Sequence, residues 1–141
     1  MAATRTATTR WEGSLFEGSG QVTLESSKLG TYEVTWAART EQPDGRTSPE
    51  ELIAAAHSSC FSMALSNGLA KAGSPPASLQ TSADVTFQPG TGITGIHLTV
   101  RGDVPGMSAD DFVAAAEAAK EGCPVSQALK ATPITLDAAL A

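Results

Sequence analysis

The sequence predicts an α+β fold for one domain spanning residues 1–141, because strand-like and helix-like segments occupy separate stretches of the chain. Short segments with alternating apolar residues gather before residue 40 and again between residues 78 and 100. Between them lies a long run of small and apolar residues, at 48–71, with helix start and stop signals at its ends. A length of 141 residues is also near the commonest size of a single domain.

The N-terminal region, up to Arg39, is expected to form short strands. Residues 13–20 are rich in turn formers, and residues 22–26 can pair as a strand. In the segment 31–39 the apolar side chains fall on one face if the chain is extended: Tyr32, Val34, Trp36 and Ala38. Arg39 is therefore expected at the end of the third strand, on the opposite face.

The long helix has the clearest boundaries in the sequence. Ser48 suits the N-cap, Pro49 suits the first helical position, and Glu51 completes a Ser-x-x-Glu capping box. The helix is expected to continue to about Lys71, since the Gly-Ser-Pro-Pro sequence that soon follows stops it.

The middle of this helix carries small or apolar residues nearly all the way round, so it cannot lie on a surface with one wet face. A single small sheet covers only one side of such a helix, and we therefore predict a homodimer in which a second copy covers the rest. The uncharged stretch at 52–70 is long enough to cross a bilayer. Its polar residues favour burial in protein over a membrane span: His57, Ser58, Ser59, Ser62, Ser66 and Asn67.

The C-terminal half is expected to contain a hairpin, two helices and a last strand. Residues 78–88 and 96–100 alternate on either side of a Pro-Gly-Thr-Gly turn, which is typical of an antiparallel hairpin. A second helix is expected at 108–122, with two aspartates in its first turn. A short helix at 125–130 and a strand that begins at 134 follow.

The charge balance and the N-terminal sequence exclude several classes of protein. The chain has 15 acidic and 9 basic residues and a net charge of -6, which disfavours nucleic acid or an anionic membrane as a partner. Residues 1–11 alternate Thr, Ala and Arg without the apolar core of a secretion signal, so we expect a cytoplasmic protein. The two cysteines match no zinc-finger spacing, and a structural disulfide is not expected in a reducing compartment.

The sequence context of the two cysteines leaves reactive and inert roles open. Cys60 lies twelve residues after Ser48, where the helix dipole no longer acts, so a reactive Cys60 needs a cation from elsewhere. Without one it is an inert core cysteine. Cys123 lies between Gly122 and Pro124 at the start of a new helix, where backbone N–H groups favour a thiolate or a good leaving group.

Two thiols of this kind suit a peroxide cycle. A thiolate attacks the terminal oxygen of a hydroperoxide, becomes a sulfenic acid and condenses with a second thiol to a disulfide. The attack needs a cation, for which arginine is suited because its charge is permanent, and the arginine needs a carboxylate to hold it. Arg39 and Glu50, which flank the turn before the long helix, are the candidates.

Two motifs around the cysteines are similar to those of a known family. The segment SPEELIAAAHSSCFSMALS at 48–66 resembles the signature of the OsmC/Ohr family, and GCPVS at 122–126 resembles its second motif. The resemblance extends from Trp11 to Asp137. It is closer to the OsmC branch than to the organic hydroperoxide resistance branch, since the arginine is expected at the end of the third strand.

The resemblance implies a thiol peroxidase that reduces organic hydroperoxides and is itself reduced by a small dithiol or a lipoylated protein; no cofactor or metal is expected. It also implies an OsmC-like intertwined homodimer, with antiparallel sheets around a long buried central helix and active sites at the subunit interface. By position, Cys60 matches the peroxidatic cysteine and Cys123 the resolving one. Arg39 matches the arginine that activates the thiolate, and Glu50 the carboxylate that orients it.

Helix geometry predicts which subunit supplies the arginine. Glu50 and Cys60, if they share one straight helix, lie about 15 Å apart along its axis. A direct contact within one chain is then excluded. We therefore predict that Arg39 and Glu50 reach Cys60 across the dimer interface.

Two other functions are compatible with part of the pattern. In the first, His57, Cys60, Cys123 and His97 bind a metal ion, since His57 and Cys60 share a helix face. In the second, the chain is a dimeric module that binds apolar ligands, and both thiols are passive. His57 taken alone is interpreted as a core histidine with its hydrogen bonds satisfied.

Overall fold

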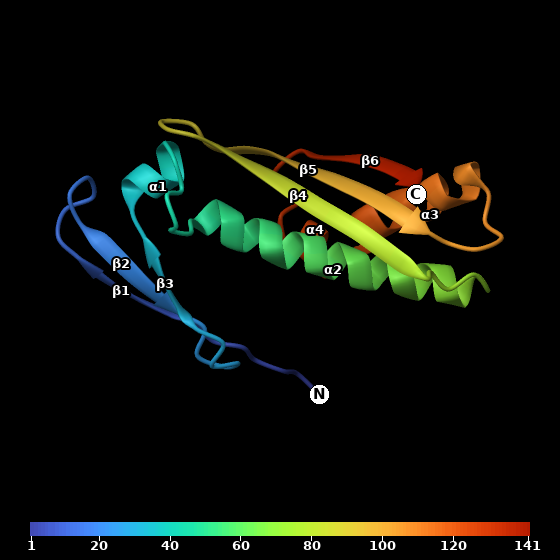
Figure 1. Ribbon diagram of the computed structural model, residues 1–141, viewed down its shortest axis with the longest axis horizontal. Coiled ribbons are helices and arrows are strands. Elements are labelled where there is room, and N and C mark those ends of the chain that lie inside the picture. The colour runs from blue at the N-terminus through green and yellow to red at the C-terminus, as the bar shows by residue number, and fades with distance from the viewer. The chain divides into compact units, whose positions relative to one another are not determined.

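The computed structural model describes residues 1–141, and the chain divides into two compact units, Met1–Leu52 and Ile53–Ala141. Three strands and a short helix come first, then a long helix, a hairpin, two more helices and a last strand (Figure 1). The α+β class predicted from the sequence is confirmed. The single domain predicted for residues 1–141 stays a prediction.

The first unit contains a three-stranded antiparallel sheet with the strand order β1-β2-β3. Strand β1 (Thr8–Glu12) pairs with β2 (Ser19–Thr23), which pairs with β3 (Thr31–Val34). A Cβ on Gly20 would lie only 2.8 Å from the Trp11 ring, so glycine lets that ring cross the neighbouring strand. The predicted short strands are confirmed, although β1 was not foreseen as one of them.

The prediction that the third strand continues to Arg39 is wrong, because this strand ends at Val34. Helix α1 (Trp36–Thr40) follows β3, and Arg39 lies in its last turn. The cause is Thr35, whose backbone is extended and whose hydroxyl accepts a hydrogen bond from the backbone N–H of Ala38 at 3.1 Å. This N-cap starts a helix where the apolar alternation alone predicted a longer strand.

Helix α2 (Pro49–Lys71) begins where the sequence predicts. The Ser48 hydroxyl accepts a hydrogen bond from the backbone N–H of Glu51 at 3.1 Å, which is one half of the capping box. The Glu51 carboxylate does not make the other half, because it accepts a hydrogen bond from the Thr47 hydroxyl at 2.5 Å. The start is therefore fixed by the serine and the proline.

The end of α2 also matches the prediction. Gly73 adopts a φ of 90°, and the backbone N–H groups of Gly73 and Ser74 donate to the carbonyls of Ala70 and Leu69. These two bonds form a Schellman motif, in which a glycine with positive φ satisfies the last free carbonyls of the helix. Neither α2 nor any other helix combines the length and apolarity that a membrane crossing requires.

The second unit contains a mixed three-stranded sheet. Strands β4 (Ser78–Gln88) and β5 (Gly92–Asp103) form the predicted antiparallel hairpin, and β6 (Ile134–Leu140) pairs with β5 in parallel. The expectation of purely antiparallel sheets is thus wrong for this one. Between β5 and β6 the chain passes through two helices, and such a crossover returns it in the same direction.

The two C-terminal helices lie close to their predicted positions. Helix α3 (Ala109–Gly122) starts at Ser108, whose hydroxyl accepts a hydrogen bond from the backbone N–H of Asp111 at 3.2 Å. Helix α4 (Pro124–Ala128) is shorter than predicted. Cys123 is the C-cap of α3 and also the N-cap of α4, so one residue forms the corner between the two helices.

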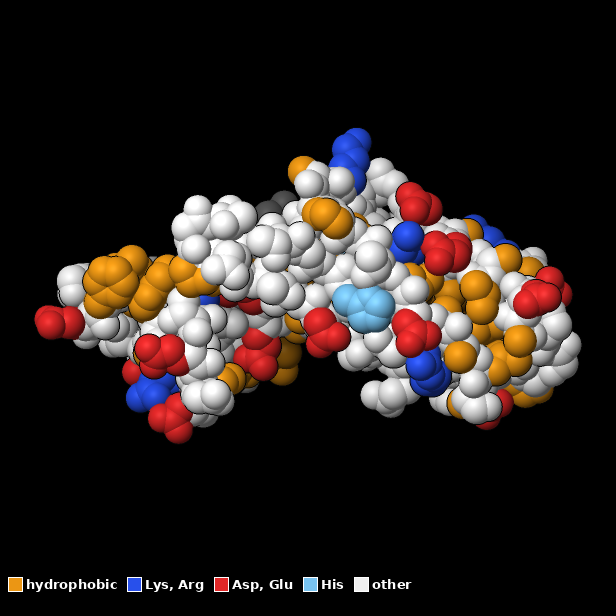
Figure 2. Space-filling model, turned by 90° about the horizontal axis from the view of Figure 1, so that it is seen from above, with side chains coloured by type: hydrophobic (Ala, Val, Ile, Leu, Met, Phe, Trp, Pro, Cys, Tyr) orange, Lys and Arg blue, Asp and Glu red, His pale blue; other side chains and the backbone are white.

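The core of the second unit lies between its helices and one face of its sheet (Figure 1). The buried residues come from α2, β5, α3 and the α3–α4 corner, with Val104 after β5: Phe61, Leu65, Leu69, Ile96, Leu98, Val100, Val104, Phe112, Ala116, Ala119 and Cys123. Within a single chain, α2 is buried along one stripe, whereas Met63 on another side is 72% exposed. The predicted enclosure of α2 is therefore only partly provided by its own chain. On the face drawn in Figure 2, acidic and basic side chains are interspersed with uncharged ones.

Candidate active site

The two cysteines meet where α2 packs against the start of α4. Cys60 lies on α2 and is half-buried, whereas Cys123 is fully buried at the α3–α4 corner. Both thiols are free, and they lie near enough for Cys123 to raise the pKa of Cys60. The structure thus brings together two cysteines that are 63 positions apart in the sequence, and one of the two residues, Cys60, is partly exposed.

The surroundings of Cys60 within the second unit disfavour its thiolate. Burial raises the pKa of Cys60 because it disfavours the charged thiolate, and the neighbouring Cys123 raises this pKa further. A hydrogen bond from the backbone N–H of Val125 lowers the pKa, but the net direction is upward. The expectation that a reactive Cys60 needs a cation from elsewhere is consistent with this balance.

The backbone N–H groups at the start of α4 interact with Cys60, whereas the sequence suggested an interaction with Cys123. The sequence suggested that its backbone N–H groups stabilise Cys123, but the Cys123 side chain makes no capping hydrogen bond. The N–H of Val125, in the first turn of α4, instead points to Cys60. The reason is that a side chain on α2 reaches the end of a helix that packs against it. This role of Val125 was not predicted from the sequence.

A cavity of about 790 Å³ opens beside Cys60 within the second unit. Its walls are mainly small and apolar side chains with an asparagine and a lysine among them: Met63, Ala64, Asn67, Gly68, Lys71, Ala72, Ala115, Ala118, Ala119, Gly122 and Pro124. Cys60 therefore lines a space in which an apolar molecule can be placed.

The predicted pairing of Arg39 with Glu50 is present in the first unit. The Arg39 Nε atom lies 3.0 and 3.1 Å from the two Glu50 carboxylate oxygens, and its Nη2 atom lies 2.8 Å from Oε1. The guanidinium also lies 5.9 Å from the centre of the Trp36 ring. A short helix and the first turn of α2 supply the two charged partners. Such a forked contact fixes both the position and the plane of the guanidinium.

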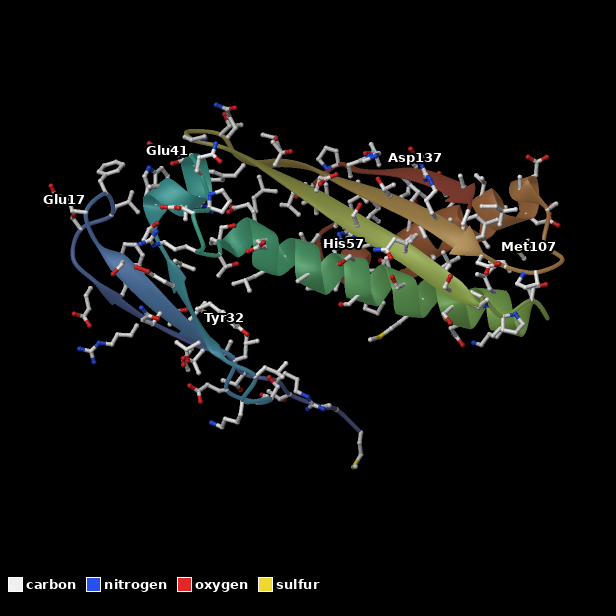
Figure 3. The ribbon with its side chains drawn as sticks, in the orientation of Figure 1. Glu17, Tyr32, Glu41, His57, Met107 and Asp137 are labelled. Atoms are coloured by element: carbon white, nitrogen blue, oxygen red, sulfur yellow. The ribbon has the colours of Figure 1, made fainter.

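His57 is buried one turn before Cys60 on α2, in the first half of that helix (Figure 3). Its Nε2 atom lies 2.7 Å from the Ser126 hydroxyl of α4, and its Nδ1 atom is buried without a hydrogen-bond partner. Burial lowers the pKa of His57, which favours the neutral ring. The core position predicted for this histidine is confirmed, but only one of its two ring nitrogens is satisfied.

The metal-binding alternative does not match the arrangement of these side chains. The structure contains no group of three or more His, Cys, Asp or Glu side chains that could hold a metal ion. The Nδ1 atom of His97 lies 2.6 Å from the Thr135 hydroxyl, on neighbouring strands of the sheet. His57 and His97 thus each have a hydroxyl partner of their own.

Comparison with known proteins identifies the family. Residues 42–137 match the OsmC-like protein family. The chain belongs to this family. It is 48% identical over 130 residues, covering 90% of each chain, to peroxiredoxin OsmC from Escherichia coli (strain K12). The peroxiredoxin OsmC of Shigella flexneri matches with the same identity and coverage. The predicted OsmC resemblance and the predicted enzyme class, a cysteine-based peroxidase, are confirmed.

Solved structures with lower identity share the fold. An OsmC-like protein from Vibrio cholerae superposes with a TM-score of 0.74 at 15% identity, over 97% of this chain and 99% of that one. An organic hydroperoxide resistance protein OsmC from Legionella pneumophila gives a TM-score of 0.72 at 20% identity, over 98% and 99% of the two chains. Both matches show the OsmC-like fold across nearly the whole chain.

Proposed function

We propose that this protein reduces organic hydroperoxides to alcohols through Cys60 and forms a Cys60–Cys123 disulfide in each cycle. The observation that supports this cycle best is the contact between two free thiols, of which only one is accessible. The Cys60 thiolate attacks the terminal peroxide oxygen, the O–O bond breaks, and the alkoxide takes a proton to leave as an alcohol. The Cys60 sulfenic acid then condenses with the Cys123 thiol, which forms the S–S bond and releases water.

The cavity beside Cys60 supports an organic substrate. Most of its lining side chains are small or apolar, and Cys60 is one of its lining residues. An alkyl or aryl group of a hydroperoxide gains free energy by leaving water for such a wall, at about 25 cal/mol per Å² of apolar surface. Hydrogen peroxide has no apolar group that could be stabilised by contact with this wall.

The reductant is expected to attack the Cys60 sulfur of the disulfide. Cys123 is fully buried, whereas Cys60 is only half-buried, so Cys60 is the sulfur that an incoming thiolate can approach. A dithiol is suited because its second thiol resolves the mixed disulfide that forms. We therefore propose a small dithiol or a lipoylated protein as the reductant. Because the cycle requires reduced thiols at rest, we also propose that it operates in the cytoplasm.

We propose that the Arg39–Glu50 pair activates Cys60 in a homodimer. Burial and Cys123 raise the Cys60 pKa within its own unit, so a cation is needed to hold the thiolate. Glu50 and Cys60 are ten positions apart on α2, which corresponds to about 15 Å of helical rise. This separation favours a second chain as the source of the guanidinium. The exposed side of α2 around Met63 offers that chain a surface of small and apolar residues.

The test of the cycle is to add one equivalent of cumene hydroperoxide to the reduced protein and map disulfides by mass spectrometry. The expected product is a Cys60–Cys123 bridge. Cys60→Ser should abolish turnover, and Cys123→Ser should leave sulfenic or higher acids on Cys60. A protein that consumes no peroxide but binds apolar ligands equally well with Cys60→Ser would instead be a module with passive thiols.

The subunit that supplies Arg39 is tested by complementation. Arg39→Ala and Cys60→Ser are each expected to be inactive alone. If Arg39 acts across the interface, mixed dimers contain one intact site, and random pairing of equal amounts restores about a quarter of the wild-type rate. The control is a mixture in which both chains carry Cys60→Ser. No recovery in dimers shown to have exchanged subunits refutes the arrangement across the interface and leaves the peroxidase cycle unaffected.

A further inference from the structure

Two contacts cross the packing between α2 and α4, and they lie one turn apart. Cys60 meets Cys123, and the His57 Nε2 atom lies 2.7 Å from the Ser126 hydroxyl. His57 precedes Cys60 by three positions, and Ser126 follows Cys123 by three. Residues three apart share one face of a helix. The histidine–serine contact and the thiol–thiol contact are therefore formed by the same two helix faces.

Helix α4 has few other polar contacts with α2. It is only five residues long, and the remaining contact is the N–H of Val125 directed at Cys60 itself. The side chain of Gln127 bonds to the carbonyl of Glu121 and so ties α4 to α3, not to α2. The hydrogen bond between His57 and Ser126 is thus the polar contact that holds α4 to α2 independently of the sulfur atoms.

The chemistry of His57 argues against a role in packing alone. The ring is fully buried, and its Nδ1 atom has no hydrogen-bond partner. Burying such an atom is unfavourable, and an apolar side chain of similar size would fill the same space without this cost. A histidine at this position is therefore best explained by its other nitrogen, which meets Ser126.

We propose that His57 is a positioning residue for disulfide formation, which holds α4 through Ser126 so that Cys123 stays within reach of the oxidised Cys60. The inference rests on the proposed Cys60–Cys123 cycle. In the condensation the Cys123 sulfur bonds to the Cys60 sulfur, the S–O bond breaks, and the hydroxyl leaves as water with the thiol proton. A disulfide requires Cβ atoms about 3.5–4.5 Å apart, so a small shift of α4 slows this step.

The first step of the cycle depends on α4 only through the backbone N–H of Val125, which is directed at Cys60. Attack on the peroxide changes bonds only at Cys60, whereas condensation requires Cys123 to be in place. A loss of positioning should therefore slow disulfide formation and leave sulfenic acid formation nearly unchanged. The longer-lived sulfenic acid then reacts with a second peroxide molecule and becomes a sulfinic acid.

The test compares His57→Asn, His57→Gln and Ser126→Ala by stopped-flow kinetics and mass spectrometry. A glutamine amide can occupy the position of Nε2 and keep the bond to Ser126, whereas asparagine is too short to reach it. In His57→Asn and Ser126→Ala we expect condensation to slow by about ten-fold, with the first step changed by less than about two-fold. Half-inactivation should need about ten-fold less peroxide. His57→Gln should restore most of the rate.

The matched control is His97→Ala, which removes a similar contact, at 2.6 Å between Nδ1 and a threonine hydroxyl, from neighbouring strands of the sheet. It should leave both steps unchanged. The inference is overturned if His57→Asn or Ser126→Ala condenses at the wild-type rate, or if both steps slow equally. Ser126→Ala is a small change that preserves the test if His57→Asn does not fold. A wild-type protein that forms no Cys60–Cys123 bridge would instead refute the proposed function itself.

Discussion

Replacing Glu50 by glutamine tests whether the ion pair with Arg39 is held by the fold. The Glu50 carboxylate has three N···O contacts with the guanidinium, at 2.8, 3.0 and 3.1 Å, and the Glu50 side chain is 9% exposed. Glutamine has nearly the same shape but no charge, and its NH₂ group replaces one acceptor oxygen. Two donors then face each other, so that one guanidinium N–H loses its partner.

The expected size of the effect follows from this geometry. A hydrogen bond to a charged group contributes about 1.5–3 kcal/mol, and a buried donor without a partner costs about 1–3 kcal/mol. The Arg39 side chain is 28% exposed, so water compensates part of the loss. We expect Glu50→Gln to lower the free energy of unfolding by about 1–3 kcal/mol, measured by urea denaturation at fixed protein concentration.

The matched control is Glu33→Gln in the same unit. Glu33 pairs with Arg46 through one contact of 3.0 Å, and both side chains are 36% exposed. Because exposed pairs contribute little, the control should lose less than about 1 kcal/mol. A loss below about 0.5 kcal/mol for Glu50→Gln, or an equal loss for the control, would show that the fold does not depend on the buried pair.

The same variant should also slow the alkylation of Cys60. An ordinary thiol, with a pKa of about 8.5, is about 3% ionised at pH 7, and burial reduces this fraction. If Arg39 fully ionises Cys60, Arg39→Ala should slow iodoacetamide alkylation by about 30-fold or more, and Glu50→Gln by a smaller factor. Wild-type alkylation rates in both variants would refute the role of the guanidinium.

Three further outcomes are expected. Gly102→Ala should destabilise the second unit by about 1–3 kcal/mol in urea unfolding, because a Cβ there would lie 2.5 Å from the Phe112 ring; an unchanged midpoint would contradict this. Burial lowers the His57 pKa, so below about pH 6.5 the unfolded chain binds more protons and stability is lost as pH falls. In His57→Gln the midpoint of urea unfolding should therefore change less with pH, between pH 5 and 7, than in the wild-type protein. Cys123→Ala should shift the pH profile of Cys60 alkylation to lower pH, because Cys123 raises the Cys60 pKa; a shift to higher pH would contradict this.

The helix boundaries could be predicted because their causes are local. Ser48 caps α2 with its own hydroxyl, and Gly73 ends it with a positive φ. The short helix that carries Arg39 was missed, since the alternation of Trp36 and Ala38 fits an extended strand equally well. Five residues are too few to show a helical period, and only the capping hydroxyl of Thr35 decides the outcome.

The parallel pairing of β6 with β5 was not predictable from alternation. The apolar face of β6 is visible in the sequence, but its direction depends on the path of the chain through α3 and α4. The contact of His57 with Ser126 is equally non-local, since 69 positions separate the two residues. A single sequence contains no signal that pairs them, although Ser126 lies within the second motif.

The upward shift of the Cys60 pKa connects the peroxide reactivity of this thiol with the formation of a dimer. Within its own unit this thiol is buried beside a second thiol, and one backbone N–H does not offset these two effects. Without a cation these surroundings disfavour the thiolate, which makes the thiol a slow target for an oxidant. If the guanidinium of Arg39 comes from a second chain, peroxide reactivity arises only when two copies meet. The initial rate per chain should then fall on dilution below the dimer dissociation constant, and a rate per chain that stays constant while the protein dissociates would place activation within one chain.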